Sequence, residues 1–296
     1  FDDTLTNKII SLLVKPAADS KNWTKPWVNL GTNDMPVSGI SNDYYTGGNA
    51  MMLMLTQMEK EYSSNVWGTY NYWCKTNDYS VKGQKGTPIY YYSKYQKENA
   101  TGDIAAIPFM KVYYVWNSVQ VDGYKAPGIE KPVMPNEAQR IANVDAFVKN
   151  TGANIVHEKH GRAFYRPSTD HIEIPEQAAF KSTNNSSATE NMYATILHEL
   201  VHWTGAKKRL DRLKNDTFGD STYAFEELVA EFGSSFLCNT LNITNTPRID
   251  HAQYLNSWLK VLKNNKTAAR KAASLAWKAV AYCNELQQKT AVKQAA

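Results

Sequence analysis

Cysteine is scarce in this sequence, and no apolar run approaches the roughly 18 residues that a membrane-spanning helix requires. The three cysteines, Cys74, Cys238 and Cys283, are widely spaced and form no CxxC pair, which argues against a disulfide framework and a cysteine-based zinc site. The apolar residues 9–14 are too few for the core of a secretory signal peptide. We therefore expect a cytoplasmic protein with buried, unpaired thiols and no membrane partner.

Arginine is absent from residues 1–135, where 13 lysines nearly balance 12 acidic residues. These residues also hold five of the eight tryptophans and 13 of the 18 tyrosines, so the two parts of the chain differ in composition. A Pro-marked stretch from Lys125 to Glu137 separates them. We expect an α+β protein of two domains, residues 1–128 and 137–296, joined by a linker at 129–136.

Apolar periodicity predicts where helices and strands lie in these domains. A helix that carries residues 198–202 is expected to end at Gly205. Other helices are expected at residues 2–14, 49–62, 137–150, 222–237 and 266–288, and from about residue 252. Aromatic strands are expected within residues 66–121, and two or three strands within residues 154–174.

Residues 198–202 read HELVH, which is the most informative motif of the chain. His198 and His202 are four apart, so on a helix their imidazoles share a face and can reach one Zn²⁺. Glu199 is then placed to act as general base on the attacking water. The alternative is an amphipathic helix with two core or solvated histidines. The apolar residues around the motif disfavour it, because buried imidazoles need polar partners.

The third ligand decides the class of site. A metzincin would place histidine at position 208, but Lys208 stands there and its ammonium has no lone pair to donate. The segment FEELVAE supplies glutamates on a second helix instead. Glu227 and Glu231 are four apart, so we predict Glu227 as ligand and Glu231 as the group that orients a ligand histidine. Glu226 is the main alternative for the ligand role.

A peptidase built on these residues needs a substrate strand and an oxyanion donor. The segment from Asp170 to Pro175 is extended, and we expect it to form an edge strand beside the metal helix that pairs with a peptide. Several side chains are candidates for the donor, and the sequence does not choose among them: Tyr165, Tyr193, Tyr223 and His171.

The aromatic residues of the first domain allow two interpretations. Exposed rings stack on bases and bind single strands without reading sequence, while lysines follow the phosphates. The KGQKG turn, with Lys82 and Lys85, precedes an aromatic strand and suits that pattern. Alternating tyrosine and valine are also ordinary strand formers, and such rings are often core.

These segments together resemble the ArdC-type antirestriction proteins of conjugative plasmids over nearly the whole chain. The resemblance rests on WTKPWVN, YYTGGNAMML, WGTYNYW, VKGQKGTPI, VYYVWNSVQVDG, TDHIEIP, HELVHWTG, KKRL and FEELVAE. It implies a single-stranded-DNA-binding domain, similar to a module of plasmid TraC-type primases, followed by a gluzincin-like metallopeptidase domain. The residues that we assign to DNA contact are Trp23, Lys25, Trp27, Tyr44, Tyr45, Lys82 and Lys85.

The resemblance further implies metal ligation by His198, His202 and a glutamate of EELVAE, with Zn²⁺ or another divalent ion such as Mn²⁺. The expected function is protection of incoming plasmid DNA from type I restriction, with a possible protein substrate in the restriction or DNA-processing machinery. Two alternatives stay open: a DNA-coating protein whose metal site is structural or inactive, and an accessory protein of plasmid replication.

Overall fold

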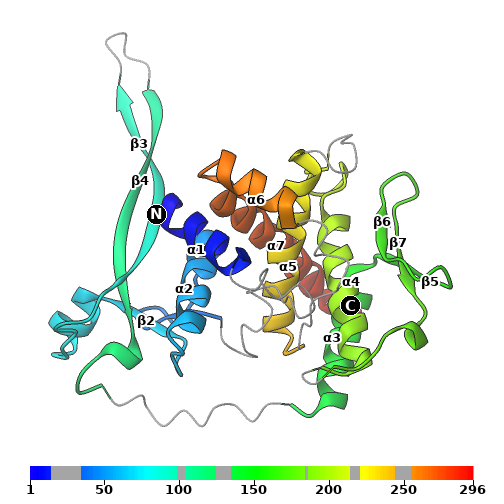
Figure 1. The fold of residues 1–296 in the computed structure, drawn as a ribbon, viewed down its shortest axis with the longest axis horizontal. Helices are drawn as coiled ribbons and strands as arrows, with labels where there is room; N and C mark the ends of the chain where they lie inside the picture. Colours follow the sequence, from blue (N-terminus) through cyan, green and yellow to red (C-terminus); the bar gives the residue numbers. More distant parts are fainter. Residues whose placement is uncertain are drawn as a thin grey trace.

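The computed structural model describes residues 1–14, 35–98, 104–124, 135–183, 186–213, 221–243 and 255–295. Within these ranges the chain combines seven α-helices with two separate β-sheets, which confirms the α+β fold expected from the sequence (Figure 1). None of the helices in these ranges is long and apolar enough to cross a membrane.

The first sheet and two helices form the N-terminal half of the molecule. Its strands lie in the order β1-β2-β4-β3, where β1 is Val37–Ser38, β2 is Val66–Thr69, β3 is Thr87–Glu98 and β4 is Ile104–Asn117. The helices are α1 (Asp2–Val14) and α2 (Gly47–Glu59), close to the predicted spans. The methionine-rich stripe of α2 lies in the core, as the pattern of its apolar residues suggests.

Strands β3 and β4 form a long antiparallel hairpin that rises away from the helices (Figure 1, left). The aromatic residues 67–73 are expected among the strands. Strand β2 ends at Thr69, however, and Asn71–Thr76 forms a π-helical turn instead. The reason is local packing, because Trp73 is fully buried against the rings of Tyr72 and Tyr124. A straight strand would carry this ring away from them.

The second half contains a three-stranded sheet and five helices. The strands are β5 (Asn154–Glu158), β6 (Phe164–Arg166) and β7 (His171–Pro175), and the helices are α3 (Glu137–Thr151), α4 (Ala188–Thr204), α5 (Ser221–Thr240), α6 (Leu255–Asn264) and α7 (Ala268–Ala295). The order β5-β7-β6 makes β7 the central strand, so the expectation that residues 170–175 form an edge strand is wrong. Its Ile172 and Ile174 are fully buried in the core, as a central strand requires.

Helix α7 connects the two halves. It contacts α1 and α2 as well as α3, α4, α5 and α6. Its alanines allow close packing, since Ala272, Ala273 and Ala276 are all fully buried in a core that also includes Leu5 and Met51. Polar contacts reinforce this packing, because Arg270 of α7 pairs with Asp2 of α1. The C-terminal helix therefore stabilises both halves of the molecule.

Candidate metal centre

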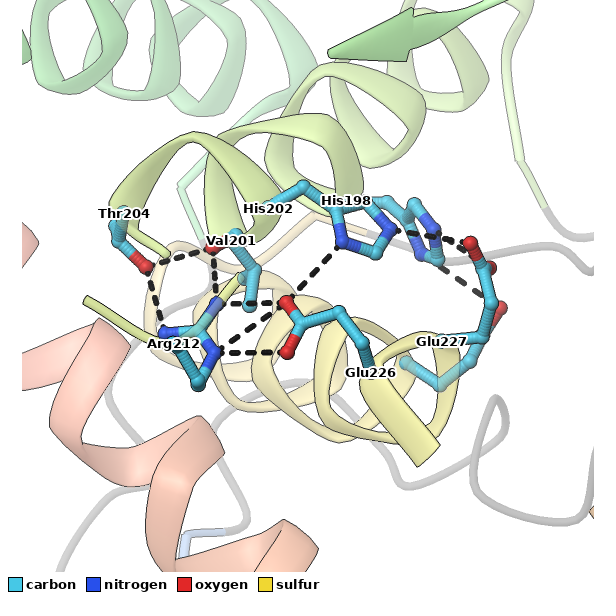
Figure 2. A network of polar contacts seen from close by, with 8 residues as sticks. His198, Val201, His202, Thr204, Arg212, Glu226 and Glu227 are labelled. Atoms are coloured by element: carbon cyan, nitrogen blue, oxygen red, sulfur yellow. Dashed lines mark hydrogen bonds and ion pairs between the residues drawn. The ribbon is translucent and has the colours of Figure 1, made fainter. Parts of the chain in front are cut away.

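Helices α4 and α5 bring the predicted ligands together. One ligand atom from each of His198, His202 and Glu227 lies within 4.8 Å of the other two, and this is the one such group of three in the described part of the chain. Nε2 of His198 is 3.6 Å from one carboxylate oxygen of Glu227, and Nε2 of His202 is 3.4 Å from the other. Both imidazoles therefore present Nε2 toward one carboxylate (Figure 2).

The sequence explains why the two helices approach so closely here. His198 and His202 share one face of α4 because they are four residues apart. Gly233 of α5 faces Val201 of α4, and a Cβ at Gly233 would come within 2.7 Å of the valine side chain. A larger residue would push the helices apart and separate Glu227 from the histidines. Ser187 and Glu190 fix the other end of α4 with a reciprocal capping box.

Each ligand imidazole also faces a second carboxylate through its other nitrogen. Nδ1 of His198 lies 3.6 Å from Glu231, and Nδ1 of His202 lies 3.3 Å from Glu226. Glu226, the alternative third ligand, is thus placed behind His202 while Glu227 lies in front of both rings. A carboxylate that hydrogen-bonds Nδ1, as Glu226 does at His202, fixes the ring orientation and keeps the proton on Nδ1, which leaves Nε2 as the electron-pair donor. Glu231 lies within ion-pair distance of His198.

Arg212 anchors this arrangement, a role that no motif predicts because the residue lies in an irregular segment after α4. Its guanidinium donates to both oxygens of Glu226, to the carbonyl oxygen of Val201 at 2.7 Å and to Thr204 Oγ1 at 3.2 Å (Figure 2). Gly205, where α4 ends as predicted, leaves room for it. A Cβ there would lie 3.0 Å from the guanidinium.

Electrostatics at the site is dominated by buried carboxylates. Burial lowers the pKa of His202, but the carboxylates of Glu227, Glu226 and Glu199 outweigh it and raise that pKa well above its usual value. Burial raises the pKa of Glu227, but the two imidazoles outweigh it and lower that pKa well below its usual value. Glu199 and Glu231 add two more buried acids, at 5% and 0% exposure. The site is therefore rich in negative charge and suited to a cation.

Most of the candidate oxyanion donors are engaged elsewhere. The hydroxyl of Tyr165 donates to Asp170 at 2.7 Å, and that of Tyr193 donates to Asp145 at 2.9 Å. Burial and these carboxylates raise the pKa of both tyrosines to about 12. His171 contacts Glu173 through Nε2 at 2.8 Å. Tyr223 is half-buried on α5, in the turn before Glu227.

The DNA-contact candidates fall in different environments. Tyr44 is 55% exposed, and Lys82 and Lys85 are exposed in the turn that precedes β3. Tyr45 is half-buried against the core, and burial raises its pKa. Trp23, Lys25 and Trp27 lie outside the described residues.

None of the three cysteines forms a disulfide bond. Cys238 and Cys283 are buried as expected, and burial raises the pKa of Cys283 to about 12. Cys74 is half-buried, so the expectation that all three thiols are buried is wrong for this one. It lies in the π-helical turn rather than in a strand, at the margin of the Trp73 cluster.

Comparison with known proteins decides the family. A model of the N-terminal domain of the anti-restriction factor ArdC matches residues 1–116, and a model of zincin-like metallopeptidases matches residues 142–275. The crystal structure of metal-free antirestriction protein ArdC from plasmid R388 superposes with a TM-score of 0.77, at 32% identity over 98% of both chains. The chain belongs to the ArdC family. The two-domain α+β organisation expected from the sequence is thereby confirmed.

Other relatives place this ArdC-family chain in a wider group. The Mn(II)-bound crystal structure of ArdC from R388 gives a TM-score of 0.75 at 33% identity, covering 97% of both chains. The uncharacterized protein y4eC of Sinorhizobium fredii is 35% identical over 93% of this chain and 88% of its own length. Two DNA primases TraC of Escherichia coli are 31% and 33% identical, but the chain spans only 28% and 20% of their length.

Proposed function

We propose that this ArdC-family protein binds single-stranded DNA through its N-terminal half and carries a divalent-metal peptidase site in its C-terminal half, and that it protects incoming plasmid DNA from type I restriction. The buried convergence of His198, His202 and Glu227 beside Glu199 carries the proposal. The family models that match the two halves support the assignment of DNA binding to the N-terminal half and of the metal site to the C-terminal half. Protection of plasmid DNA would then need both halves: the N-terminal half binds the DNA, and the C-terminal half acts on a protein at the bound DNA.

The metal of this site is expected to be Zn²⁺ or Mn²⁺, held by His198, His202 and Glu227. Two imidazole nitrogens and one carboxylate are a donor set that zinc accepts, with further coordination left open for a substrate. The crystal structure of ArdC from R388 with Mn(II) supports a divalent ion in this family. Such an ion supplies Lewis-acid polarisation of a substrate carbonyl. Glu226 and Glu231 hold the two imidazoles in the ligating orientation.

Glu199 is the residue that we assign to proton transfer. It follows His198 directly on α4 and is only 5% exposed, so its carboxylate is screened from bulk water. A general base here takes the proton of the attacking water and returns it to the leaving amine. The substrate we expect is a protein of the restriction or DNA-processing machinery.

One observation favours an alternative function. His198, Glu199 and Glu227 are exposed by only 6%, 5% and 6%, so a polypeptide substrate has little access to them in this conformation. A structural metal would suit such a site, since closed sites are typical of structural zinc. In that case the protein protects DNA by coating it. An accessory role in plasmid replication would fit the TraC relatives, although the chain spans less than a third of them.

The proposal is tested first on the intact protein with DNA. We expect fluorescence titration to show tighter binding to a single-stranded oligonucleotide than to its duplex, with an affinity that falls as salt rises. In cells with a type I restriction system, expression of the protein should raise the recovery of unmodified plasmid DNA. Equal affinity for both DNA forms, or unchanged recovery, would refute the corresponding half of the proposal.

Arg212→Lys is expected to weaken divalent-metal binding about 10- to 100-fold, the usual effect of losing a group that orients a metal ligand. Lysine has a single nitrogen and cannot hold both oxygens of Glu226 together with the Val201 carbonyl and Thr204. Glu226 would then lose its fixed position against His202. Competition with a metal chelator measures the change in affinity.

Arg209→Lys is the matched control for this prediction. Arg209 comes from the same segment and is also buried, at 5% side-chain exposure against 7% for Arg212. It pairs with Asp170 and packs on Trp203, so its loss should lower stability without moving His202. Similar metal affinities for the two variants would show that Arg212 has only a structural role.

A further inference from the structure

The β3–β4 hairpin carries aromatic side chains that the fold leaves uncovered. Among the exposed large apolar residues in the described part of the chain, eight lie on its two strands between positions 91 and 114: Tyr91, Tyr92, Ile104, Phe109, Met110, Val112, Tyr113 and Tyr114. The hairpin rises away from the helices, so no helix in view covers this part of it (Figure 1). Exposed apolar side chains gathered on one element are typical of a binding surface.

The side chains divide between the two faces of the hairpin, because neighbouring residues of a strand point to opposite sides. Tyr91 lies directly opposite Lys111, and Phe109 and Tyr113 lie two residues to either side of Lys111. These four residues, which we call the hairpin patch, therefore share one face. Tyr92 lies opposite Met110 on the other face.

The hairpin patch is a set of rings around one ammonium group. The ring centroids of Tyr91 and Phe109 are 6.4 Å apart, and Lys111 Nζ lies 5.2 Å from the centre of the Tyr113 ring. The rings are open to solvent, with exposures of 55% for Tyr91, 37% for Phe109 and 39% for Tyr113. Tyrosine and phenylalanine rings held by strand backbone are rigid platforms, so little conformational entropy is lost when a flat ligand stacks on them.

The charge of the residues around the hairpin patch indicates which kind of ligand the patch binds. Between Ser80 and Asn117, the sequence contains five lysines, at 82, 85, 94, 97 and 111, and two acids, Glu98 and Asp103. A surface that combines open rings with an excess of lysine fits a polyanion whose flat groups are accessible. Single-stranded nucleic acid has both properties, whereas the bases of a duplex are paired and stacked.

We propose that the hairpin patch is the principal single-strand-binding site of the protein, where Tyr91, Phe109 and Tyr113 stack on successive bases and Lys111 pairs with a phosphate. This inference rests on the proposed function and adds the residues that carry it. None of these four was among the DNA contacts expected from the sequence. The lysines of the 82–85 turn extend the same positive charge toward the base of the hairpin.

The test compares two triple variants of the whole chain, residues 1–296, in titrations with a labelled oligo-dT. The first replaces Tyr91, Phe109 and Tyr113 by alanine, and the matched control replaces Tyr92, Met110 and Tyr114, whose exposures are 55%, 42% and 55%. Because stacking contributes about 1–3 kcal/mol per base, the patch variant should lose about 100-fold or more in affinity. The control should stay within about threefold of the wild type.

Three further single variants test whether the Tyr91 ring and the Lys111 charge bind DNA directly. Tyr91→Phe keeps the ring and should bind nearly as the wild type does, whereas Tyr91→Ala should not. Lys111→Gln removes one phosphate contact, so the slope of log affinity against log salt should fall by about 0.7. Thermal melting of each variant checks that the fold is retained, as expected for exposed positions.

The outcomes distinguish this inference from the proposed function. If the wild type binds oligo-dT and the patch variant binds as tightly, the hairpin patch is not the site, although DNA binding stands. Equal losses in the patch and control variants would also overturn the inference, since both faces would then matter alike. If the wild type itself does not bind oligo-dT, the proposed function and this inference both fail, and the patch is better explained as a protein-binding surface.

Discussion

His202→Ala is expected to weaken divalent-metal binding about 100- to 1,000-fold. Structural zinc sites with four protein ligands bind with roughly 10–16 kcal/mol, so one ligand is worth about 2.5–4 kcal/mol. The substitution also leaves Glu226 and Glu227 without the imidazole that each of them contacts. Metal content after dialysis and competition with a chelator measure the loss, and zinc and manganese should both be tried.

A histidine that contacts a carboxylate away from this site provides the control. Nε2 of His160 lies 2.9 Å from Glu173, in the sheet formed by β5, β6 and β7. His160→Ala should leave metal affinity unchanged. If His202→Ala binds metal as tightly as the wild type while His160→Ala does not, the ligand assignment at α4 and α5 is wrong.

The convergence of His198, His202 and Glu227 was partly predictable, because it follows in part from helix periodicity. Residues four apart share a face in any α-helix, so HELVH alone places His198 and His202 together. The same rule placed Glu227 and Glu231 on one face of α5, and the structure puts them near the same histidine. The i, i+4 pattern favours Glu227 over Glu226, but the position of Glu226 behind His202 depends on the angle between the two helices, which no local pattern encodes.

Features that depend on long-range packing could not be read from the sequence. Arg212 looks like any other basic residue in a polar segment, and its role appears only when that segment folds back over the end of α4. The central position of β7 depends on which strands flank it, whereas its sequence shows only that it is extended. The direction of each aromatic ring on the hairpin likewise depends on register, and Tyr91 and Tyr92 have identical sequence signals but lie on opposite faces.

Glu199→Gln should abolish peptidase activity while leaving metal and DNA bound. The amide keeps the volume and polarity of the side chain but cannot accept the proton of the attacking water. General-base catalysis contributes about 10²- to 10⁴-fold, so cleavage of a general protein substrate such as casein should fall by at least that range. Metal content and oligo-dT affinity should match the wild type, which would show that the site is still assembled.

The same variant decides between the two accounts of restriction protection. If a peptidase acts on the restriction machinery, Glu199→Gln should protect incoming plasmid DNA no better than an empty vector, while Glu176→Gln, at an exposed position outside the site, should protect fully. If coating is sufficient, Glu199→Gln should protect as well as the wild type, and only the hairpin-patch variant should fail. Full protection by Glu199→Gln would therefore remove the peptidase from the proposed function and assign the metal a structural role. Loss of protection both in Glu199→Gln and in the hairpin-patch variant would mean that DNA binding and catalysis are each required.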